Sequence, residues 1–83
     1  MSISSPITAD AAAHVLFHYG HDGGYQAGSF TTHLITAIDS ADVSNKARLT
    51  LGFPEYVAAV NLIQNHRDGA DRLRAIVHGE AAA

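Results

Sequence analysis

The strongest constraint on this chain is a series of five stretches whose apolar residues recur at helical spacing, each separated from the next by helix-breaking residues. Within each stretch an apolar side chain returns every three or four residues, which is the period of an amphipathic helix. The breaks carry glycine or proline, or a residue that can cap the following helix. No stretch shows the alternation of a strand. The sequence therefore predicts an all-α fold, a compact bundle of four to five short helices, running from about Ala9 to Tyr19, Phe30 to Ser40, Val43 to Leu51, Pro54 to His66 and Ala70 to His78.

Four residues are placed to start these helices. Thr8, Ser29 and Asp42 are types that accept a hydrogen bond from a free amide in the first turn, and each precedes a predicted helix. Pro54 opens the fourth helix, because proline is tolerated at the first helical position. Gly20 is expected to end the first helix.

Four of the predicted helices, all but the third, have an apolar face for the core. The second helix is expected to bury Phe30, Leu34, Ala37, Ile38 and Ala41, and the first to bury Ala12, Val15, Leu16 and Tyr19. The fourth helix is apolar over most of its circumference. A helix of that kind lies at the centre of a bundle or shares a face with another chain.

Size and composition favour one small domain over residues 1–83, with fraying expected at 1–7 and 79–83. There is no cysteine, so neither a disulfide framework nor a thiolate metal site is available. No apolar run is long enough to span a membrane, and Met1–Pro6 lacks the basic and apolar segments of a signal peptide. A cytoplasmic protein is predicted.

The charge pattern argues against nucleic acid and anionic membranes as partners. The formal net charge is −3, from five Lys or Arg and eight Asp or Glu, and the cations are dispersed. Lys46 and Arg48 on the third helix could touch a DNA backbone in a helix-turn-helix arrangement. The fourth helix, which would then read the bases, begins with proline, Glu55 and apolar residues. A small DNA-binding regulator stays as an alternative.

Three histidines define a candidate metal site. His14 and His18 are four residues apart and share a helix face, and His21 follows in the loop. Both helical histidines point away from the apolar stripe at 100° per residue, which predicts that both are solvated. The spacing matches no known zinc motif, so ordinary surface histidines are the preferred interpretation and a histidine-based metal-binding module is the alternative.

Two other chemical interpretations find little support in the sequence. Gly23 and Gly28 have the glycine spacing of a phosphate-binding loop, but the required lysine is missing and no strand precedes the loop. The amides near Ser29 could hold an anion, although capping by that serine is the simpler account. No nucleophile, base and acid occur in a recognised catalytic setting, so the chain is predicted not to be an enzyme and to need no cofactor.

Partner binding is predicted for apolar residues that lie off the core stripes or on the broad face of the fourth helix. These candidates are Phe17, Ile35, Tyr56, Ala59 and Leu62. In so short a chain, several such residues favour a docking surface or a homodimer.

Two segments carry a resemblance to a known group of proteins. Gly28-Ser29-Phe30-Thr31-Thr32 and Leu51-Gly52-Phe53-Pro54-Glu55-Tyr56-Val57-Ala58-Ala59 resemble parts of small helical proteins encoded by bacteriophages of actinobacteria. The resemblance covers about residues 13–77 and transfers no binding or catalytic residues. It implies a small phage accessory protein that acts by protein–protein interaction, with a host protein as partner in the host cytoplasm.

Overall fold

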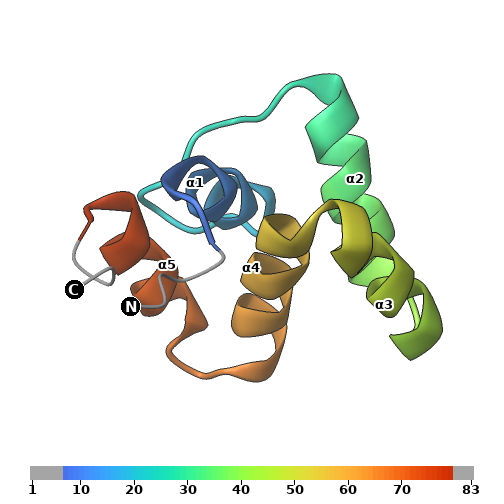
Figure 1. Ribbon diagram of the computed structural model, residues 1–83. Coiled ribbons are helices and arrows are strands. Elements are labelled where there is room, and N and C mark those ends of the chain that lie inside the picture. The colour runs from blue at the N-terminus through green and yellow to red at the C-terminus, as the bar shows by residue number, and fades with distance from the viewer. Residues whose placement is uncertain (1–6, 80–83) are drawn as a thin grey trace, which may run out of the picture.

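The computed structural model describes residues 7–79 and contains five helices (Figure 1). They are α1 (Ala9–His18), α2 (Ser29–Ser40), α3 (Val43–Gly52), α4 (Pro54–Asn65) and α5 (Gly69–Val77). Residues 7–79 contain no strand. The predicted all-α bundle is confirmed, and each helix begins and ends within one residue of its predicted bounds.

Helix α4 lies at the centre of the bundle. It contacts each of the other four helices, with α5 on one side and α3 on the other (Figure 1). Val57, Ala59 and Val60 are buried in these contacts. Of the two explanations for its broad apolar surface, the central position within the chain is therefore the correct one.

The core is built from small and branched residues of α1 and branched residues of α2, α4 and α5. Ala11, Ala12 and Ala13 are fully buried, and their short side chains let neighbouring helices approach α1 closely. The largest fully buried side chains are Leu16, Ile35, Ile38, Leu73, Val15 and Val60. Tyr19, predicted for the core, is half-buried and packs against its edge.

The side of α2 that is buried in the structure differs from the predicted side by a rotation about the helix axis. Leu34 and Ile38 are buried as expected, but Phe30 is 66% exposed and Ala37 is exposed too. Ile35, placed at the edge of the face by the sequence, is buried. The reason is that α2 packs against both α1 and α4, so its inward face is wider than one stripe and centred elsewhere.

Three of the four predicted helix starts are confirmed. The Oγ1 of Thr8 accepts a hydrogen bond from the Ala11 amide at 3.1 Å, and Asp42 accepts one from the Asn45 amide at 2.8 Å. Pro54 is the first residue of α4. Ser29 does not cap α2, because the helix already begins at this residue and Gly28 holds the cap position without a side-chain bond.

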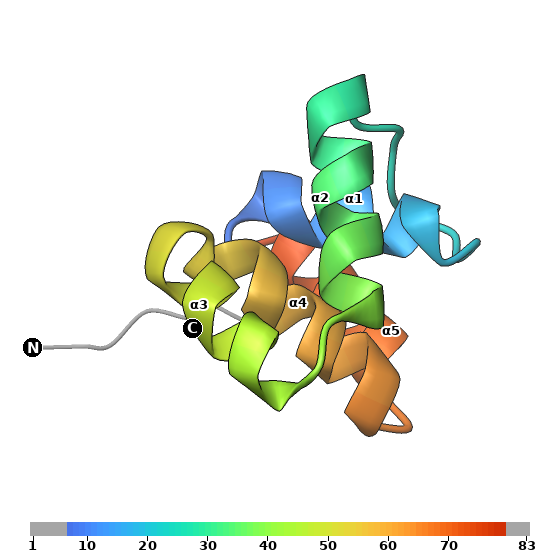
Figure 2. The ribbon, with the colours of Figure 1, turned by 90° about the vertical axis from the view of Figure 1, so that its right-hand side faces the viewer.

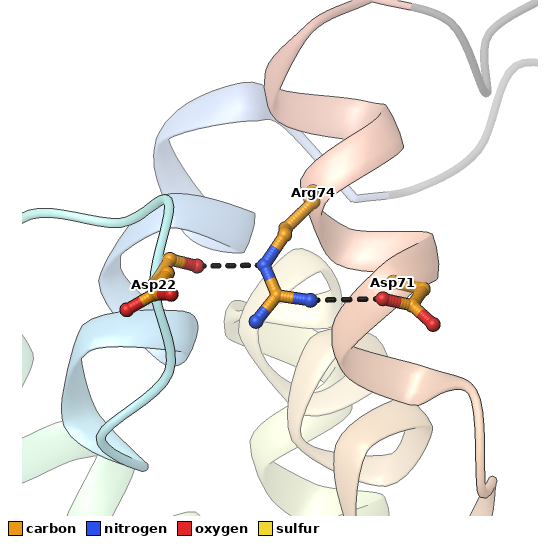
Figure 3. A network of polar contacts seen from close by, with 3 residues as sticks. All are labelled: Asp22, Asp71 and Arg74. Carbon is orange, nitrogen blue, oxygen red and sulfur yellow. Dashed lines mark hydrogen bonds and ion pairs between the residues drawn. The ribbon is translucent and has the colours of Figure 1, made fainter.

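The glycine loop between α1 and α2 is held against α1 and α5. Gly20 adopts a left-handed φ of 78° that ends α1, and the Tyr25 amide donates to the Ala13 carbonyl at 3.3 Å. Arg74 on α5 donates from Nε to the Asp22 carbonyl at 2.9 Å and from Nη1 to Asp71 at 2.8 Å (Figure 3). Arg74, whose guanidinium also pairs with Asp71, thus links the loop to α5, in addition to the backbone contacts of the loop with α1.

Gly24→Ala is expected to lower the free energy of unfolding by about 1–3 kcal/mol, the usual cost of overpacking. A Cβ at this position would stand 2.2 Å from the Ala13 carbonyl oxygen and 2.8 Å from the Phe17 nitrogen, and backbone atoms cannot move aside cheaply. Urea unfolding measures the effect. Gly52→Ala is the matched control: nothing lies within 4 Å of its added methyl, so this variant should be as stable as the wild type or more stable.

The expected fraying at the two ends is only partly open to comparison. Residues 1–6, which include the segment considered as a signal peptide, and residues 80–83 lie outside the described part of the chain. Ile7 is 9% exposed and belongs to the core, so fraying there is wrong. Among residues 7–79, no helix combines the length and the apolar character that crossing a bilayer requires.

Candidate functional site

The outward face of α3 is the most exposed apolar surface in the described part of the chain. Val43, Ala47 and Leu51 recur every fourth residue and therefore line one side of the helix. Val43 is 86% and Leu51 88% exposed, and no residue of α3 is buried. Figure 2 shows α2 and α3 in front, with α4 and α5 behind them. We call Val43, Ala47 and Leu51 the α3 stripe.

The opposite side of α3 fixes the helix to its neighbours. Lys46 donates from Nζ to Gln64 Oε1 at 2.9 Å and to Asn61 Oδ1 at 3.5 Å, both on α4. Leu49 packs against the core, and the Asp42 cap holds the first turn. The helix therefore keeps its position without any contribution from the α3 stripe.

A groove separates α3 from α2. It encloses about 390 Å³ and is lined by Ala37, Ser40, Ala41, Asn45, Arg48 and Leu49. Ala37 on α2 and Ala41, which follows the end of that helix, leave space that larger side chains would fill, and Arg48 lines the groove from α3. We call this feature the α2–α3 groove.

The charge of α3 differs from that of the chain as a whole. Val43–Gly52 contains Lys46 and Arg48 and no acidic residue, whereas the whole chain has a net charge of −3. The ammonium of Lys46 is engaged by α4, while Arg48 is exposed and makes no hydrogen bond or ion pair with any residue from 7 to 79. Of the two cations considered for a DNA contact, only Arg48 therefore has no partner among residues 7–79.

A polar network on the inner side of this region links the end of α1 with α2 and α4. The hydroxyl of Tyr19 donates to Asp39 on α2, and Gln64 Nε2 donates to the same carboxylate at 2.8 Å. These two hydrogen bonds, with a smaller contribution from the positive charges of His18 and Lys46, hold the pKa of Asp39 below its ordinary value. Burial, and then the bond to Asp39, raises the pKa of Tyr19.

Asp39 is expected to make stability depend on pH in the acid range. Because its pKa is lowered by folding, its contribution is present above the ordinary carboxyl pKa and is lost as the pH falls through the folded value. Urea midpoints should decline below about pH 4 in the wild type. The decline should be shallower in Asp39→Asn and in Tyr19→Phe, which keeps the carboxylate but loses the bond; unchanged slopes in both would contradict this assignment.

A second, smaller hollow lies between α1, α2 and the glycine loop. It encloses about 150 Å³ and is lined by His14, Phe17, His18, Gln26, Ala27, Thr32 and Ile35. We call it the α1–α2 hollow. The structure thus brings together four residues that the sequence had singled out separately for metal or partner binding.

His14 is half-buried, so the prediction that it is solvated is wrong. Its Nδ1 lies 2.8 Å from the Tyr56 hydroxyl, and its ring meets the edge of Tyr25 at a centroid distance of 5.3 Å. The hydroxyl of Tyr25 in turn donates to Asp10. The helical wheel missed this because the loop and α4 both cover a side of α1 that lies off its apolar stripe. His18 is likewise half-buried.

The three predicted metal ligands do not come together. His14 and His18 share the α1–α2 hollow, but the left-handed turn at Gly20 leads the chain away, and His21 is exposed outside that hollow. Among residues 7–79 no three His, Cys, Asp or Glu side chains are close enough to hold a metal ion.

The five predicted partner-binding residues are divided by burial. Ile35 is 1% and Ala59 0% exposed, because both fill the interior between packed helices, so neither can reach a partner in this fold. Tyr56 and Leu62 are half-buried against the core. Phe17 is 49% exposed and is the one member of the set with a large free apolar surface.

Sequence reasoning missed the α3 stripe. Its signal was present: Val43, Ala47 and Leu51 follow each other at intervals of four, on the side of the helix opposite Leu49. No apolar face was assigned to this short helix from the sequence, so the stripe was not recognised.

Neither a protein-family model, nor a curated protein, nor a solved structure gives a significant match to this chain.

Proposed function

We propose that this protein is a non-enzymatic accessory protein that acts by binding another protein through the outward face of α3. The observation that carries the proposal is the exposure of Val43 and Leu51, at 86% and 88%. These are the most exposed large apolar side chains among residues 7–79. They stand one turn on either side of Ala47, whose small side chain allows close approach of a partner.

The energetics favour burial of this surface by a partner. Fully burying a valine or leucine side chain is favourable by about 1.5–3 kcal/mol, so the two together would contribute about 3–6 kcal/mol to a complex. The bundle does not use them, since α3 is held by Lys46, Leu49 and the Asp42 cap. A contiguous exposed apolar surface that the fold does not need is typical of an interaction site.

The resemblance to phage-encoded proteins indicates which kind of protein we propose as the partner. A small phage protein of this kind would bind a protein of its actinobacterial host. We therefore place the complex in the host cytoplasm.

A photo-cross-linking residue at Ala47 tests the proposal. In extract from actinobacterial cells, we expect a discrete cross-linked protein from position 47. The matched control carries the same residue at Ala9, another exposed alanine, on α1, which makes no contact with α3. Identical products from both positions, or none from position 47, would contradict the proposal.

A further inference from the structure

We propose that the α2–α3 groove binds a small molecule that joins a carboxylate to a compact apolar body. The carboxylate is held by Arg48 and Asn45, which line the groove from α3. The apolar body lies against Ala37, Ala41 and Leu49, the apolar residues of the lining. The inference goes beyond the proposed docking function, because it concerns a second site and a different class of ligand.

The α2–α3 groove and the α3 stripe lie on different sides of α3. At 3.6 residues per turn, Asn45 and Leu49 each stand about 160° around the helix axis from Ala47, the middle residue of the stripe, and Arg48 stands about 100° from it. A ligand in the groove therefore leaves the stripe uncovered, and each site can be tested while the other is unchanged.

Two side chains in the groove offer hydrogen-bond donors that the fold does not use. The guanidinium of Arg48 and the carboxamide of Asn45 form no hydrogen bond or ion pair with any residue from 7 to 79; the bond between Asn45 and Asp42 involves the backbone amide. The two side chains are neighbours on the helix surface, since they are three residues apart. A guanidinium matches a carboxylate with two parallel hydrogen bonds, and the carboxamide can donate a third.

The size and walls of the groove favour a small molecule over an extended peptide. Its volume of about 390 Å³ falls in the range of small-molecule sites, roughly 300–1,000 Å³. Both walls are helices, whose backbone groups are already paired within the helix. The hydroxyl of Ser40, which also lines the groove, donates to the carbonyls of Thr36 and Ala37. A peptide backbone would therefore find few partners here.

The end of α2 fixes the direction in which the ligand lies. Helix α2 ends at Ser40, and the carbonyls at the C-terminal end of a helix carry partial negative charge. A carboxylate is therefore more favourable beside Arg48 on α3 than beside the end of α2. Asp39 and Asp42, the acids nearest in sequence to this end, are both hydrogen-bonded within the fold, and neither pairs with Arg48.

Three probes with the same aromatic body test the inference: phenylpropionate, phenylpropionamide and phenylpropylamine. Each is titrated at neutral pH into the full-length ¹⁵N-labelled protein, and amide shifts locate the site. We expect phenylpropionate to shift amides in the last turn of α2 and in α3. It should bind about fivefold more tightly than the amide, as an exposed charge pair allows, and the amine should bind most weakly.

Two variants with matched controls assign the two halves of the ligand. Arg48→Gln should remove the preference for the carboxylate over the amide, whereas Arg67→Gln, an equal charge change at an exposed position between α4 and α5, should keep it. Ala37→Leu fills the groove and should abolish the shifts with all three probes. Ala47→Leu adds the same atoms to another exposed alanine, on the α3 stripe, and should leave the shifts unchanged.

Several outcomes would overturn this inference. They are equal binding of carboxylate and amide, an unchanged preference in Arg48→Gln, undiminished shifts in Ala37→Leu, shifts confined to the α1–α2 hollow, and no shifts with any probe. Tighter binding of an acetylated dipeptide that ends in leucine would replace the free small molecule by the end of a polypeptide chain. The cross-linking result at Ala47 concerns the other side of α3 and decides the proposed function independently.

Discussion

Leu16→Ala is expected to lower the free energy of unfolding by about 2–5 kcal/mol, the range for leucine truncation in a core. Leu16 is fully buried in α1 and belongs to the single core cluster formed by α1, α2, α4 and α5. A domain of this length has a total stability on the order of 4–12 kcal/mol. The variant should therefore be much closer to unfolding at room temperature, as urea titration followed by circular dichroism would measure.

Leu51→Ala is the matched control for this truncation. It removes the same atoms from another helix, but Leu51 is 88% exposed, so the change should be within about 0.5 kcal/mol. A large loss of stability in Leu51→Ala would mean that the α3 stripe is covered in solution, which would contradict a free docking surface.

The double variant Val43→Ser, Leu51→Ser is expected to abolish most partner binding while leaving the fold intact. If each side chain is buried in the complex, their loss removes about 3 kcal/mol or more, which weakens binding by at least about 100-fold. The partner captured through Ala47 provides the ligand, and calorimetry measures its affinity. Circular dichroism and the urea midpoint should stay close to those of the wild type, because neither side chain is buried.

Phe17→Ser distinguishes the two candidate surfaces. Phe17 is 49% exposed and lines the α1–α2 hollow, together with His14 and His18. If α3 is the docking surface, this variant should bind the partner as tightly as the wild type. Loss of binding in Phe17→Ser, together with unchanged binding in the double serine variant, would move the interaction to the α1–α2 hollow.

Much of the candidate site can be recognised in the sequence only after the fold is known. The α3 stripe is a period-four pattern that a buried face would show equally well, and Arg48 is unremarkable until Lys46 is seen to be engaged by α4. In the opposite direction, Ile35 and Ala59 were predicted to contact a partner but are buried. Periodicity indicates that a residue lies on an apolar face, but not which body covers that face.

The sequence by itself determined the limits and most of the starts of the helices, because these depend on neighbours in the chain. Thr8, Asp42 and Pro54 act on the first turn of their own helix, and Gly20 acts through its own φ angle. Only the tertiary structure decided which face of α2 is buried, that α4 is central, and that the outward side of α3 is left uncovered. Those outcomes depend on how helices far apart in the chain fill one volume, which no local pattern encodes.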